Sequence, residues 1–161
     1  MDSPAFTFSH VVISLLAIVS GIAVLYGLIA ARKFEAWTLL FLVATTATSA
    51  TGFLFHRDRI LPSHVLGVIS LVLLAGAAVA FYVFRLRGVW RGVYVVGAVA
   101  ALYLNVFVLI VQGFLKVPFL HALAPTQTSE PAFVASQLLV LLVFLVLGAF
   151  SLLRFWPLAT A

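Results

Sequence analysis

Long apolar runs, separated by one or two cationic residues, are the feature that most constrains this chain. Five such runs follow one another, and almost all charged residues fall between them. A helix of about 20 apolar residues crosses the hydrocarbon core of a bilayer. With 65% apolar and 8% charged residues among 161, the chain has too little polar surface to cover a water-soluble core. The sequence therefore predicts an all-α integral membrane bundle of five transmembrane helices, forming one domain.

The five spans are expected at about residues 8–31, 36–55, 62–84, 93–114 and 132–153. No basic residue precedes the first run, so we expect a retained span rather than a cleaved signal peptide. The long connection, residues 116–131, is apolar at its start and rich in proline, which predicts a short helix on the membrane surface. Glu130 and Pro131 suit the start of the last helix.

The positions of lysine and arginine predict the orientation, because loops rich in these residues stay in the cytoplasm. With the N-terminus external and the C-terminus cytoplasmic, the cytoplasmic cations are Arg32, Lys33, Arg85, Arg87, Arg91 and Arg154. The external cations are then Arg57, Arg59 and Lys116. This six-to-three bias, with all three tryptophans near the cytoplasmic helix ends, favours that orientation.

Two amides lie inside the fourth run. Asn105 and Gln112 share one helical stripe with Ala98 and Ala101, so we expect both amides to face the bundle interior. An amide in hydrocarbon needs a hydrogen-bond partner. That partner is either another helix or a bound ligand, and the sequence leaves both readings open.

All four histidines, His10, His56, His64 and His121, fall on the predicted external side, together with Asp58 and Glu130. Neutral imidazole is the commonest metal ligand, and two histidines on neighbouring helices can hold a b-type haem. His10 and His64 form the best pair, since each precedes a small residue one turn on, Ser14 and Gly67, and a flat macrocycle needs such room. The alternatives are interfacial histidines bonded to headgroups, water or a carboxylate such as Asp58, and a protonation switch.

Several function classes lack the residues that they need. The absence of cysteine excludes thiolate chemistry, and the scattered cations do not suit nucleic acid. No motif assigns an enzymatic reaction.

The leading hypothesis is a membrane protein whose external histidine site binds a transition metal or haem. The alternative is an accessory or assembly subunit without its own cofactor, in contact with lipid and other membrane subunits. A small-solute transporter ranks third, because no charged residue lies within a run.

The stretch 103–131, YLNVFVLIVQGFLKVPFLHALAPTQTSEP, resembles small inner-membrane proteins of proteobacteria to which no function is assigned. The resemblance implies a bacterial inner (cytoplasmic) membrane and no particular activity. In layout alone, the chain is also similar to small helical proteins with external histidines that take part in haem–copper oxidase assembly.

Overall fold

The structure is a computed structural model that describes residues 3–55, 62–126 and 130–156. It is 85% helical, and its described residues include no strand, so the all-α prediction is confirmed. The elements in order are α1 (Pro4–Ile29), α2 (Glu35–Gly52), α3 (Pro62–Ala78), the π-helix η1 (Val79–Val83), α4 (Trp90–Lys116), α5 (Pro118–Leu123) and α6 (Pro131–Arg154).

Four helical segments of the described chain are long and apolar enough to cross a membrane: α1, α3 continued by η1, α4 and α6. The fold is therefore that of a multi-pass membrane protein. The helix α2 has 18 residues but includes five threonines and a serine, which make it less apolar. It packs along α1 on one side and α3 on the other. Whether α2 supplies the fifth span remains a prediction.

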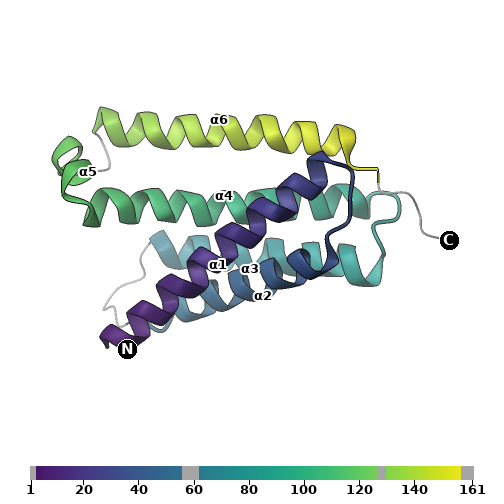
Figure 1. The fold of residues 1–161 in the computed structure, drawn as a ribbon, viewed down its shortest axis with the longest axis horizontal. Coiled ribbons are helices and arrows are strands. Elements are labelled where there is room, and N and C mark those ends of the chain that lie inside the picture. Colours follow the sequence, from purple (N-terminus) through teal and green to yellow (C-terminus); the bar gives the residue numbers. More distant parts are fainter. Residues whose placement is uncertain (1–2, 56–61, 127–129, 157–161) are drawn as a thin grey trace.

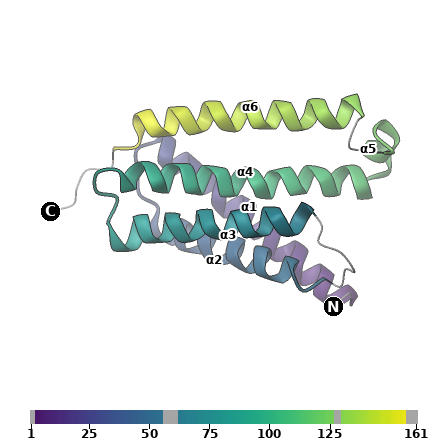
Figure 2. The same cartoon turned by 180° about the vertical axis from the view of Figure 1, so that it is seen from behind.

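The helices run back and forth, so the bundle has two ends, which Figures 1 and 2 show from opposite sides. We call one the arginine end: it holds the α1–α2 connection, the η1–α4 turn and the end of α6. The other is the histidine end, which holds the start of α1, the ends of α2 and α4, the helix α5 and the start of α6. His10, His64 and His121 all lie toward the histidine end.

The apolar core lies toward the arginine end. The buried residues of α1 begin only at Ala17, and those of α4 run from Tyr94 to Leu102, with Phe114 as the exception. Glycines bring helices together here: a Cβ on Gly97 would lie 2.9 Å from the backbone oxygen of Leu73 on α3. Such close approach is the usual way in which helices associate in lipid. The first half of α1 is much less buried.

The helix boundaries differ from the expected ones for local reasons. The first helix begins at Pro4 rather than near residue 8, because the Ser3 hydroxyl accepts a hydrogen bond from the amide of Phe6 (3.3 Å) and proline suits the first turn. It ends at Ile29, where Ala31 adopts a left-handed conformation (φ 55°). The predicted surface helix in the long connection is present as α5, and α6 starts at Pro131 with Glu130 as its N-cap residue.

Candidate functional site at the histidine end

His10 lies on α1 and contacts the end of α2. Its Nδ1 is 2.7 Å from the hydroxyl oxygen of Thr51, and its ring meets the edge of Phe55 with 5.1 Å between centroids. The backbone oxygen of His10 accepts a hydrogen bond from Ser14 (2.7 Å). The imidazole is therefore held in one orientation between the two helices.

The hydrogen bonds of Thr51 determine the tautomer of His10. A threonine hydroxyl has one hydrogen, and Thr51 directs it to the backbone oxygen of Ala47 at 2.7 Å. Its oxygen therefore accepts from His10, and Nδ1 of His10 carries the proton. In the neutral imidazole the lone pair is then on Nε2, the nitrogen that could bind a metal or accept a proton.

His64 lies near the start of α3 and stacks on the ring of Phe53, with 5.6 Å between centroids and 13° between planes. A groove of about 430 Å³ beside it is lined by Phe53, Val65 and Val68 as well. The sequence suggested that Gly67 leaves room for a flat macrocycle. The Phe53 ring takes that room, because a Cβ on Gly67 would lie 2.9 Å from it.

His121 lies on α5 at the tip of the bundle. Its Nδ1 is 3.3 Å from the backbone oxygen of Phe114, which can only accept, so Nδ1 is again the donor. Glu130, at the start of α6, accepts a hydrogen bond from the Thr126 hydroxyl (2.8 Å). The hydrogen bonds of His121 and Glu130 therefore stabilise the connection between α4 and α6.

The predicted metal ligands have separate partners. His10 contacts Thr51 and Phe55, His64 contacts Phe53, and His121 contacts the end of α4. His56 and Asp58 lie outside the described residues. In the part of the chain that the structure describes, no group of three or more histidine and carboxylate side chains could hold a metal ion.

The prediction for Asn105 is confirmed, and the one for Gln112 is wrong. The amide nitrogen of Asn105 donates to the hydroxyl of Thr45 on α2 (3.2 Å), so this amide joins two helices. Gln112 is exposed. Although Gln112 lies on the same stripe, it is two turns nearer the histidine end, where α1 has no buried residue before Ala17.

Sequence reasoning missed three buried oxygens in this half of the bundle. Within the described residues, the side-chain oxygens of Thr48, Ser70 and Gln137 have no hydrogen-bond partner, and only one such oxygen, that of Ser151, lies at the arginine end. The amide nitrogen of the Gln137 side chain donates to the backbone oxygen of Phe107 on α4 (3.3 Å). The available signal was a glutamine nearly two turns into a mostly apolar span. Buried oxygens of this kind need a water or another donor.

Arg91 was also missed as a contact residue, since the sequence presented it only as a topology signal. Its guanidinium donates to the backbone oxygens of Leu152 (2.7 Å) and Phe155 (2.8 Å) and lies 4.0 Å from the ring centre of Trp156. These oxygens are at the end of α6, where helical carbonyls lack partners. Arg91 therefore fixes the end of α6 to the start of α4.

No protein family model matches this chain, and no curated protein sequence or solved structure matches it either.

Proposed function

We propose that this chain is an accessory or assembly subunit of a membrane protein complex, with α6 as the helix that packs against the partner. The observation that carries the proposal is the low burial of α6. Only 6% of its most apolar 18-residue stretch is buried, against 44% for α1, 28% for α3 with η1 and 39% for α4.

The residues that α6 buries are not those expected of a helix that packs only against other helices of its own chain. They are Gln137 and Ser151, both polar, whereas leucines such as Leu142 and Leu145 are about 60% exposed (59% and 61%). Helices in lipid are held together by close packing and hydrogen bonds rather than by removal of apolar surface from water. A span with so little packing in the monomer has a whole face available for a helix of another protein.

Photo-crosslinking in native membranes tests the proposal. A photoreactive residue is placed at Leu142 or Leu145 on α6 and, as matched controls, at Val19 on α1 and Val68 on α3, which are 58% and 54% exposed. We expect both α6 positions to yield one discrete protein adduct, and the controls to yield lipid adducts only. The same protein should co-purify stoichiometrically without crosslinking. Equal adducts at all four positions, or an adduct of two copies of this chain, would overturn the proposal.

The proposal includes five spans in a bacterial inner membrane, with the N-terminus external. Its support is the bias of six cations at the arginine end, which this orientation places in the cytoplasm. A reporter active only in the cytoplasm should be active at the C-terminus. An inactive cytoplasmic reporter there, with an active periplasmic one, would contradict the orientation.

A metal or haem site remains the second candidate, and the tautomers of His10 and His121 favour it. Both rings donate from Nδ1 to an oxygen and so keep the lone pair on Nε2, the arrangement that orients metal-ligating histidines. An absorption spectrum and elemental analysis of the detergent-purified protein test this candidate. A haem band or a stoichiometric metal that is lost in His10→Ala would support it, and protein with neither would eliminate it.

A further inference from the structure

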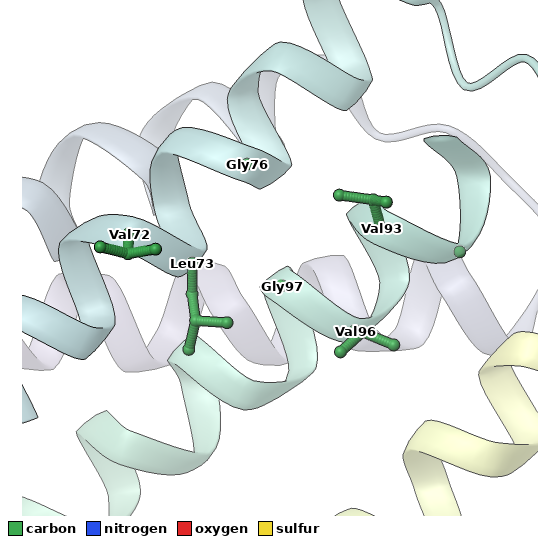
Figure 3. A pocket seen from close by; sticks show the side chains of 7 residues that line it. Val72, Leu73, Gly76, Val93, Val96 and Gly97 are labelled. Atoms are coloured by element: carbon green, nitrogen blue, oxygen red, sulfur yellow. The ribbon is translucent and has the colours of Figure 1, made fainter. Parts of the chain in front are cut away.

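An apolar groove opens on the outer surface of the bundle between α3 and α4. It has a volume of about 400 Å³, within the range of small-ligand sites. Figure 3 shows Val72 and Leu73 of α3 and Val93 and Val96 of α4 along its borders. Its lining is almost wholly apolar, so an apolar chain is the chemistry that fits it.

Glycines create this groove. At Gly97 the two helices touch, with a built Cβ 2.9 Å from the backbone oxygen of Leu73, and this contact closes the floor. At Gly92 no atom lies within 4 Å of a built Cβ, and at Gly76 the nearest atom is 3.8 Å away. The groove therefore widens from Gly97 toward the arginine end.

Beyond the wide end of the groove, a tight turn presents two arginines. Arg85 and Leu86 have positive φ angles (51° and 61°), and the Leu86 side chain is 7% exposed and packs into the core. The Leu86 amide donates to the backbone oxygen of Ala80 (2.9 Å), which holds the turn against η1. Arg85 and Arg87, on either side of the buried leucine, are exposed.

The same turn has the side chains of a membrane interface. The rings of Phe84 and Trp90 stack with centroids 3.8 Å apart, and Val89 is 79% exposed. Aromatic rings favour the headgroup level of a bilayer, and arginine binds phosphate through two parallel hydrogen bonds. Gly92 is the third residue of α4 and follows Arg87 closely in the chain, so the cations lie close to the open end of the groove.

We infer that the α3–η1–α4 hairpin binds an anionic phospholipid, with an acyl chain in the glycine groove and the headgroup phosphate at Arg85 and Arg87. Charge and shape both select this occupant. The turn offers two exposed guanidiniums, and the groove offers an apolar channel that opens toward them. Arg91 takes no part, since it is engaged by the end of α6.

Native mass spectrometry of the full-length protein in detergent tests the inference. Phosphatidylglycerol, which is anionic, and phosphatidylcholine, which is zwitterionic, are titrated separately. We expect one phosphatidylglycerol to bind more tightly than phosphatidylcholine. Each juxtamembrane cation contributes about fivefold to anionic-lipid affinity, so Arg85→Gln with Arg87→Gln should weaken phosphatidylglycerol about 30-fold. The variant with both Arg85→Lys and Arg87→Lys should retain most of the affinity for phosphatidylglycerol.

Matched controls separate this site from general attraction to the arginine end. Arg32→Gln with Arg154→Gln removes the same charge from exposed positions outside the hairpin and should change the affinity less than threefold. For the groove, Gly92→Leu should weaken phosphatidylglycerol, whereas Gly52→Leu, on α2 with equally open space, should not. Should Gly92→Leu lower the helix content, Val96→Phe at the groove border replaces it.

Three results would overturn the inference: equal affinity for the two lipids in the wild type, equal loss in the two pairs of arginine variants, or unchanged binding in a folded groove variant. If a helix of a partner protein filled the groove in place of an acyl chain, lipid binding would be unchanged in the groove variant, which is the third result. None of these depends on the subunit proposal, whose test concerns α6.

Discussion

The arginine end and the histidine end of this bundle are built from the same helices but packed differently. At the arginine end Phe41, Tyr94 and Phe155 are all at most 2% exposed, and the Tyr94 hydroxyl is 2.8 Å from that of Thr38. At the histidine end the polar links, such as that of His10 with Thr51, are only partly buried. Residues 4–16 of α1 include no buried side chain.

This difference follows from where close approach is possible. Gly21 and Gly97 lie in the arginine half and let α1, α3 and α4 meet at short distance. Gly52, the one serine and all the threonines of α2 except Thr38 lie toward the other end. Since packing is the main source of helix association in lipid, stability should be concentrated at the arginine end. The histidine end keeps oriented polar groups with room for a ligand or partner.

The largest expected effect comes from separating α3 and α4 at their closest point. Gly97→Val places a side chain against the backbone oxygen of Leu73, which cannot rotate away, and should destabilise the protein by about 3 kcal/mol. The same substitution at Gly52, where no atom lies within 4 Å of a built Cβ, should change stability by less than about 0.5 kcal/mol. Reversible unfolding in mixed micelles, followed by circular dichroism, measures both. Similar losses of stability in the two variants would show that the two ends pack equally well.

Much of the fold could be predicted from the sequence because lipid imposes a simple rule. Backbone polar groups must be paired within a span, so each long apolar run forms a helix and each cluster of charge or proline ends it. The short α5 and the start of α6 at Pro131 followed from local signals. The start of α1 was missed although Ser3 and Pro4 are a common N-terminal pair.

The candidate site was less predictable, because side-chain partners depend on how helices cross. Asn105 and Gln112 share a helical face, yet only Asn105 has α2 beside it. Likewise, one-dimensional spacing placed a small residue after His64 but could not indicate that the Phe53 ring lies over it. The position of Arg91 against the end of α6 also requires the tertiary fold.

Removing the Arg91 contact should have the next largest effect. Arg91→Met keeps an apolar stem but leaves the backbone oxygens of Leu152 and Phe155 without their charged donor, at a cost of about 2 kcal/mol. Arg91→Lys should recover about half, because one ammonium cannot reproduce the guanidinium fork. Arg32→Met, at an exposed position of the same end, is the control and should be nearly neutral. Equal stability of Arg91→Met and wild type in the micelle assay would contradict this role.

A smaller effect compares one polar link from each end. A double-mutant cycle with Thr38→Val and Tyr94→Phe should give a coupling of about 1 kcal/mol, because that pair is buried. The cycle with His10→Phe and Thr51→Val should give about 0.5 kcal/mol, near the average for interhelical hydrogen bonds in membranes. Both couplings come from unfolding in the same micelles. A stronger coupling at the histidine end would reverse the proposed distribution of stability.

The last expected effect is a gain of stability at the arginine end, from Ala31→Gly. The turn after α1 is a Schellman motif: the Arg32 amide donates to Gly27 (2.9 Å) and the Ala31 amide to Leu28 (3.3 Å). This motif puts Ala31 in the left-handed region (φ 55°), which costs an L-residue with a Cβ about 1–2 kcal/mol. Glycine removes that cost but adds about 0.5–1 kcal/mol of unfolded-chain entropy, so the net stabilisation should be about 0.5–1 kcal/mol.

Ala30→Gly, at a position with negative φ (−81°), is the control and should lower stability, because there glycine has only the entropic cost. If Ala31→Gly were no more stable than wild type in the micelle assay, the left-handed turn would not be the conformation that ends α1.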